Sequence, residues 1–91
     1  MDFHIKLSIQ EIVDDFEKLL RLDEELNVKL DFKECEEEDI SKFHNGVVEI
    51  AGKYIPNYMD HMQETDSEYD FALELYKIVY SNFKEIFFKL V

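Results

Sequence analysis

The sequence predicts an all-α protein, a three to four helix antiparallel bundle formed by a single domain over residues 1–91. Three observations predict it. The chain has only 2 glycines and 1 proline, which leaves few sites for the tight turns of a hairpin-rich β fold. Apolar residues make up 46% of the chain, enough to form a core. Long stretches repeat their apolar residues at spacings of three and four, as one face of a helix requires.

The first helix is predicted over residues 9–26. Ser8 and Glu11 form a capping-box pattern, in which the two side chains accept hydrogen bonds from the free N–H groups of a helix start. We expect a stop at Asn27. Residues 28–33 then alternate apolar and charged side chains, which fits either an extended segment or a frayed continuation of the helix. The apolar stripe of this helix holds Ile9, Ile12, Val13, Phe16, Leu19, Leu20 and Leu26.

A second helix is predicted over residues 39–55. Pro56 ends it, because proline lacks the N–H group that a helix interior needs. Gly46 and Gly52 lie inside this helix, where each costs up to about 1 kcal/mol relative to alanine. We expect close approach of a neighbouring helix to explain them. The apolar stripe holds Ile40, Phe43, Val47, Ile50, Ala51 and Tyr54.

A third helix is predicted over residues 67–90, opened by a second capping box from Thr65 to Glu68. Residues 57–63 fit a short helical turn before it. Tyr69, Tyr76, Tyr80 and Phe88 lie off the apolar stripe or at its margins, and exposed aromatic rings are typical interface anchors. The stripe itself holds Phe71, Leu75, Ile78, Val79, Phe83, Ile86 and Leu90.

Composition indicates the class of partner. The chain holds 22 Asp and Glu against 10 Lys and Arg, a formal net charge of -12. Such a surface repels nucleic acid and anionic membranes and attracts cationic proteins, although excess acid also serves solubility alone. Residues 1–7 fit either an extended arm or a helix lead-in, and neither a signal peptide nor a membrane span is expected. The single Cys35 has no internal disulfide partner, so a reducing cytoplasm fits best.

Enzymatic chemistry finds little support in the sequence. Cys35 with His44 or His61 resembles a nucleophile and base, but neighbouring acids would raise the pKa of the thiol and make it less reactive. His61 and Glu64 would share one face if that stretch were helical, and Glu34, Glu37 and Glu38 carry oxygen ligands, so a small metal-dependent enzyme stays an alternative. A solvated acidic face explains the same residues, and we expect no catalytic residue, metal or cofactor.

Two acidic regions are the candidate binding surfaces. All residues from 34 to 39 except Cys35 are acids, and residues 54–76 contain six acids and no Lys or Arg. Acids at a helix N-terminus also complement the positive end of the helix dipole, which gives them a structural role. With helices antiparallel, the two regions need not merge. The candidate partner-binding residues are Glu36, Glu37, Glu38, Asp39, Asp60, Glu64, Asp66, Glu68, Tyr69, Asp70 and Tyr76.

The order of motifs in the second half of the chain resembles a known family. Tyr54 and Pro56 precede an acid-rich segment at residues 64–68 and then an amphipathic C-terminal helix carrying Leu75. This order, over residues 40–85, resembles the small helical immunity proteins of nuclease bacteriocins, of the colicin D immunity type. Members of that family bind the RNase domain of the cognate toxin and cover its active site with acids that stand in for tRNA phosphates. The resemblance implies blocking carboxylates at Asp60, Glu64, Asp66 and Glu68.

We therefore expect an acidic helical protein that inhibits a basic nuclease or another nucleic-acid-binding protein by occupying its nucleic-acid site. An immunity protein and a phage-encoded inhibitor would look alike at this level. The main alternative is a homo-oligomeric helical adaptor, in which the aromatic excess of the third helix is buried against a second copy.

Overall fold

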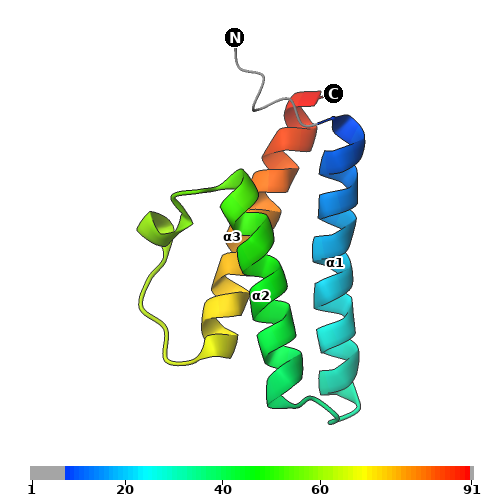
Figure 1. Cartoon of the computed structure of the whole chain (residues 1–91), viewed down its shortest axis with the longest axis vertical. Coiled ribbons are helices and arrows are strands. Elements are labelled where there is room, and N and C mark those ends of the chain that lie inside the picture. Colours follow the sequence, from blue (N-terminus) through cyan, green and yellow to red (C-terminus); the bar gives the residue numbers. More distant parts are fainter. Residues whose placement is uncertain (1–7, 91) are drawn as a thin grey trace.

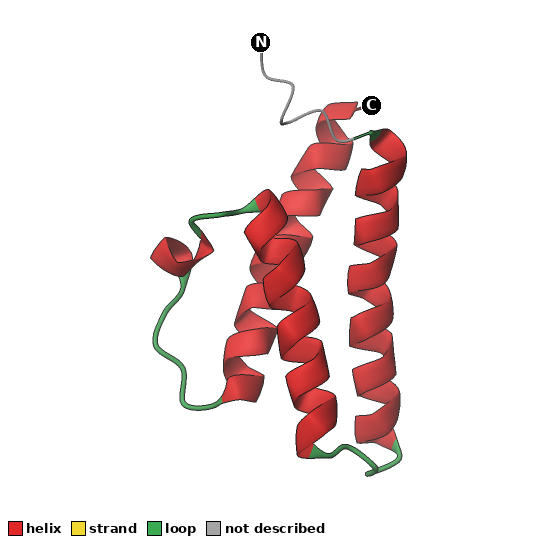
Figure 2. Ribbon diagram, viewed as in Figure 1, coloured by secondary structure: helices red, strands yellow, loops and turns green. Residues whose placement is uncertain are grey.

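The computed structural model describes residues 8–90, so the predictions for residues 1–7 lie outside the described chain. Three long helices lie side by side: α1 (Ile9–Asp31), α2 (Glu37–Tyr54) and α3 (Glu68–Leu90), with a short 3-10 helix, η2 (Tyr58–His61), between α2 and α3 (Figures 1 and 2). No strand occurs within residues 8–90. The all-α prediction is confirmed.

The start of α1 follows the prediction, but its end does not. Ser8 Oγ accepts a hydrogen bond from the Glu11 N–H at 3.0 Å, as the capping box requires. The helix continues past Asn27 to Asp31. It ends where the Glu34 N–H donates to the Lys29 carbonyl at 2.8 Å, a C-terminal closure that needs a left-handed residue just before Glu34. Lys33 occupies that position with φ 58°, where glycine is the usual residue.

The start of α3 corrects a detail of the sequence analysis. Ser67 Oγ accepts a hydrogen bond from the Asp70 N–H at 3.1 Å, so Ser67 caps the helix. The predicted capping box from Thr65 to Glu68 is wrong, because the serine and Asp70 offer the same spacing two residues further along. The preceding helix, α2, ends at Tyr54, two residues before Pro56, as predicted.

The long connection between α2 and α3 decides the topology. In Figure 1, α1 runs down, α2 runs up, and residues 55–67 return along α2, so that α3 also runs up. Ser41 Oγ donates to Glu68 Oε1 at 3.0 Å near the start of both helices. The rings of Tyr54 and Phe83 lie 4.8 Å apart toward the ends of both. The antiparallel arrangement therefore holds for α1 against its neighbours and is wrong for α2 against α3.

The core lies along the inner faces of the three helices. Phe43, Val47 and Ile50 of α2 face the stripe of α3 that is centred on Leu75 and Val79. Between α1 and α3 the contact is made by rings. Phe16 packs on Tyr80, Phe83 and Phe87 with centroid distances of 5.8, 5.2 and 5.3 Å. The fully enclosed core residues are Leu19, Leu26, Phe43, Val47, Ile50, Ala51, Ala72, Leu75, Val79 and Phe83.

The two glycines of α2 have different surroundings. A Cβ at Gly46 would lie 2.5 Å from Leu22 Cδ1, so α1 approaches α2 closely there, as expected. A Cβ at Gly52 would meet nothing within 4 Å, so close approach does not explain this glycine. Over residues 8–90, no helix is both long enough and apolar enough to cross a membrane.

We predict that Lys33→Gly stabilises the protein by about 0.5–1 kcal/mol, because a residue with a Cβ is strained in the left-handed region. Urea denaturation followed by circular dichroism measures the change. Lys33→Ala is the matched control, since it removes the same charge and keeps the Cβ. An equal gain from Lys33→Ala would assign the effect to charge instead of backbone conformation.

We also predict that Gly52→Ala stabilises the protein by about 0.5–1 kcal/mol, the difference in helix propensity, because its Cβ has open space. Gly46→Ala should give a smaller gain or a loss, since the Leu22 side chain must first move. Thermal unfolding of both variants tests this difference, and a gain at position 46 equal to that at position 52 contradicts the close approach.

Candidate partner-binding surface

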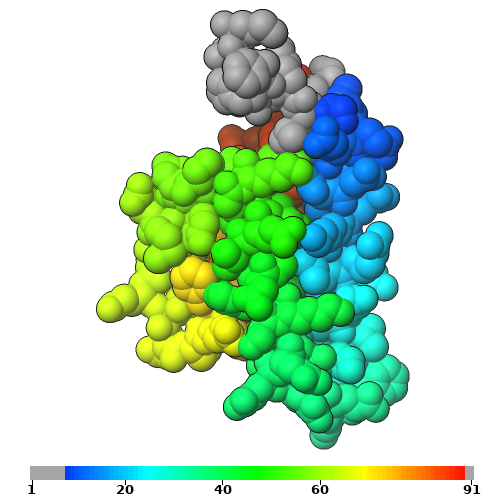
Figure 3. Space-filling model, viewed as in Figure 1, coloured from blue at the N-terminus to red at the C-terminus, as the bar shows by residue number. Residues whose placement is uncertain are grey.

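The parallel arrangement of α2 and α3 brings parts of the two predicted acidic regions together. The first turns of both helices lie at the same end of the molecule, joined by the bond from Ser41 to Glu68. In Figure 3 the start of α3, in yellow, lies against α2, and the turn between α1 and α2 protrudes beyond it. We name this region the acidic end; it consists of Glu34, Glu36, Glu37, Glu38, Asp39, Glu68 and Asp70.

Some of these carboxylates have structural partners. Lys29 Nζ lies 3.8 Å from Asp39 Oδ1, and Asp39 Oδ2 accepts a hydrogen bond from the Glu36 N–H at 3.0 Å. His44 Nδ1 lies 3.8 Å from Glu68 Oε2, on the other side of the carboxylate that Ser41 contacts. Asp39 and Glu68 therefore help to position the two helix starts.

Other carboxylates of the acidic end are left to solvent. Glu34, Glu37, Glu38 and Asp70 are exposed and form no ion pair with any residue in 8–90. Two parallel helices place their positive dipole ends side by side, and acids in their first turns offset that unfavourable arrangement. The same side chains remain free to pair with Arg or Lys of another molecule.

The other predicted acids lie along the connection between α2 and α3. Asp60 belongs to η2, which in Figure 1 lies beside the C-terminal half of α2. Glu64 and Asp66 follow in the exposed connection that descends toward α3. The structure therefore brings Glu68 and Asp70 to the first acidic region and leaves Asp60 apart from it.

The two predicted tyrosines have packing partners within the chain. Tyr69 is partly buried against the core. The Tyr76 ring lies 5.9 Å from the ring of Phe43 and 5.9 Å from that of Tyr80. Burial, with the nearby negative charge of Asp23 as a further cause, raises the pKa of Tyr76 to about 12. Neither ring protrudes as an isolated anchor.

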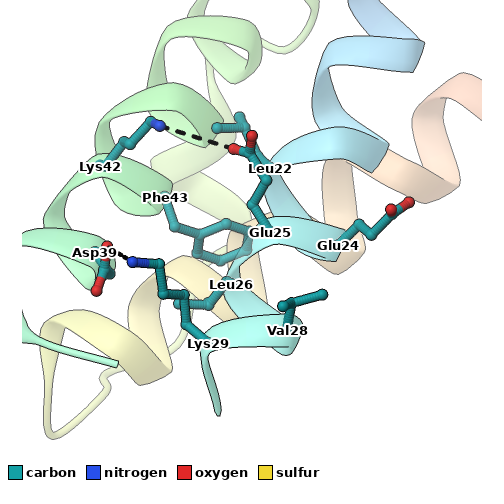
Figure 4. Close-up of a pocket in the computed structure, with 9 residues that line it drawn as sticks. All are labelled: Leu22, Glu24, Glu25, Leu26, Val28, Lys29, Asp39, Lys42 and Phe43. Atoms are coloured by element: carbon teal, nitrogen blue, oxygen red, sulfur yellow. Dashed lines mark ion pairs between the residues drawn. The ribbon is translucent and has the colours of Figure 1, made fainter. Parts of the chain in front are cut away.

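A groove between α1 and α2 was missed by the sequence analysis. It has a volume of about 350 Å³, and Figure 4 shows Phe43 and Leu26 at its centre. Two ion pairs cross it, with Lys42 Nζ 3.7 Å from Glu25 Oε1 and Lys29 paired with Asp39. The residues that line it are Leu22, Glu24, Glu25, Leu26, Val28, Lys29, Asp39, Lys42 and Phe43. Val28 and Lys29 line the groove but lie beyond the predicted end of the first helix at residue 26. The sequence pattern therefore did not indicate that they share a helix face with Leu22 and Leu26.

The structure does not assemble the enzymatic candidates. The 3-10 helix ends at His61, so the helical spacing assumed for His61 and Glu64 is absent. No group of three or more His, Cys, Asp and Glu side chains within residues 8–90 is arranged to hold a metal ion. Cys35 Sγ has a weak contact with the Glu36 carbonyl at 3.8 Å, while His44 faces Asn45 and Glu68.

Comparison of the chain with models of protein families, with curated proteins and with solved structures finds no match.

One carboxylate with a lowered pKa lies outside the acidic end. Asp15 of α1 accepts hydrogen bonds at Oδ2 from Tyr54 Oη at 2.5 Å and from Lys53 Nζ at 2.8 Å. Partial burial alone would raise the pKa of Asp15, but these two donors outweigh it and hold the pKa below the usual 3.8. Burial and the same carboxylate raise the pKa of Tyr54. This cluster joins α1 to the last turn of α2 and is structural.

We predict that Asp15→Asn destabilises the protein by about 1–2 kcal/mol at pH 7, the usual contribution of hydrogen bonds to a charged group at a partly exposed site. Because folding lowers the pKa of Asp15, its contribution is present above the unfolded pKa and is lost as pH falls through the folded pKa.

The stability difference between wild type and Asp15→Asn should therefore shrink as pH falls below about 4. Urea unfolding at a series of pH values measures it. Asp14→Asn is the control, at an exposed neighbouring position whose side chain, within residues 8–90, accepts a hydrogen bond from Gln10. A difference that stays constant down to pH 2 would contradict the assigned role of the charge.

Proposed function

We propose that this protein binds a basic macromolecule through its acidic end and inhibits a nuclease or another nucleic-acid-binding protein by occupying its nucleic-acid site. The observation that carries the proposal is the convergence of two acidic helix starts at one end, with several carboxylates free of ion pairs in residues 8–90. The net charge of -12 favours a cationic partner.

Electrostatics explains why such a surface suits an inhibitor. A nucleic-acid site presents Arg and Lys side chains to phosphates, and exposed carboxylates can form the same charge-assisted hydrogen bonds. Complementary charge also speeds association and makes it sensitive to salt. Catalysis is not needed for this activity, and we propose none for this chain.

The resemblance to immunity proteins of the colicin D type is consistent with this proposal. Of the four carboxylates that the resemblance implies, Glu68 lies at the acidic end, and Asp60, Glu64 and Asp66 follow the connection beside α2. The proposed contact surface therefore extends from the acidic end along this connection. The single Cys35 fits a cytoplasmic location.

A homo-oligomeric adaptor is the second candidate, favoured by exposed aromatic side chains. Phe32 at the end of α1 is 71% exposed, and Phe88 near the end of α3 is 83% exposed. Burial of such rings against a second copy would remove their apolar surface from contact with water, which favours association. The large negative charge of each copy opposes this association. Sedimentation across a concentration series separates the two proposals, because the inhibitor is expected to remain a monomer without its partner.

We predict that Glu37→Gln/Glu38→Gln weakens partner binding about fivefold to tenfold, as loss of two exposed ion pairs implies. The salt dependence of binding should also flatten. The partner is first captured from the native organism and identified by mass spectrometry. Its binding is then titrated at several salt concentrations, and inhibition of its nuclease or nucleic-acid-binding activity is measured.

Glu17→Gln/Glu85→Gln is the matched control, because both glutamates are exposed on helices and their loss changes the net charge equally. This variant should bind almost as well as wild type. Equal weakening by both variants would indicate a general effect of net charge and exclude a specific role for the acidic end. A captured partner that is not basic, or whose activity the chain does not inhibit, contradicts the proposed function.

A further inference from the structure

We infer that the groove between α1 and α2 receives an apolar anchor side chain, of the size of leucine or phenylalanine, from the basic partner. The inference rests on the proposed function and specifies the chemistry of its partner: a basic segment that carries one large apolar residue.

The floor of the groove is apolar and already built. Leu26 and Phe43 lie at its base but are only 4% and 1% exposed, so the apolar surface open to an occupant comes from Leu22 and Val28. Val28 lies at the margin of the groove with 49% of its surface exposed. An apolar side chain placed here would cover Val28 and extend the core without rearrangement of the three helices.

The charged residues at the rim of the groove favour a positively charged occupant. Glu25 pairs with Lys42, and Asp39 pairs with Lys29, so each lysine of the rim already faces a carboxylate. Glu24 also lines the groove and forms no ion pair with the described residues, which leaves the rim with one more acid than base. A partner segment with Arg or Lys beside its apolar residue fits this rim.

The position of the groove links it to the acidic end. Asp39 belongs to both, so one partner segment can place an apolar side chain in the groove while its cations reach Glu37 and Glu38. A second copy of this chain is the weaker occupant, because it would bring another net charge of -12 to the same carboxylates. The volume of about 350 Å³ accommodates one such side chain and lies at the lower end of known sites for small organic groups.

Defined peptides test the inference without the natural partner. The probes are two fluorescein-labelled peptides of alternating Arg and Ala, one with a central leucine and the other with a central serine. We expect the leucine peptide to bind the full chain about tenfold more tightly, the gain from burying part of one leucine side chain. In methyl NMR spectra it should shift the signals of Leu22, Leu26 and Val28, and the serine peptide should leave them unchanged.

A pair of variants localises the preference. Val28→Ser should reduce the preference for the leucine peptide to about threefold or less. The substitution removes apolar surface that the leucine side chain would otherwise cover. Leu20→Ser, on an exposed part of the same helix outside the groove, should keep the full preference. Both positions are at least one third exposed, so both variants are expected to fold, and circular dichroism verifies this.

The outcomes separate this inference from the proposed function. Equal, salt-sensitive binding of both peptides would overturn the anchor site and leave the acidic binding surface standing. Binding of neither peptide would overturn both. A concentration-dependent dimer that Val28→Ser abolishes would assign the groove to a second copy and overturn the inference of a basic partner.

Discussion

The apolar contact between α2 and α3 is the interaction on which the rest of the structure depends. Phe43, Val47 and Ile50 share the core with Leu75 and Val79, and the two helices that carry these residues run in the same direction. Residues 55–67 must therefore return along α2, and Pro56 supports this by ending α2 at a defined point. The starts of α2 and α3 therefore lie at the same end, which brings Glu68 and Asp70 toward the first acidic region.

That arrangement has an electrostatic cost and a functional consequence. The positive dipole ends of α2 and α3 lie side by side, and the first-turn acids offset them. Asp39 and Glu68 are held by Lys29 and by Ser41 and His44, so they stabilise the fold. Glu37, Glu38 and Asp70 extend into solvent and are available to a partner. The acids of the two helix starts thus combine a structural role with a proposed binding role. Neutralising Asp39 or Glu68 would disturb the fold and, with it, the proposed binding surface.

The groove and the acidic end together describe a surface with two components. Carboxylates attract a basic segment over a distance and give the encounter its salt dependence. Burial of an apolar side chain in the groove, beside Leu22 and Val28, would then slow dissociation, which is where most differences in affinity arise. Acids alone distinguish partners poorly, since any cationic surface satisfies them. A groove of limited volume adds a requirement for shape that charge does not provide.

Local sequence patterns predicted the helical class, the approximate bounds of three helices and the acidic character, because apolar spacing, capping residues and charge act over a few neighbouring positions. They placed Glu36–Asp39 and Glu68–Asp70 at helix starts correctly, but they did not determine that these starts meet. The continuation of α1 to Asp31 was one of two alternatives that the local pattern of residues 28–33 left open, and the groove beside Val28 was not predicted. These features arise at the tertiary level, because helix direction depends on which apolar faces pack across residues far apart in the chain.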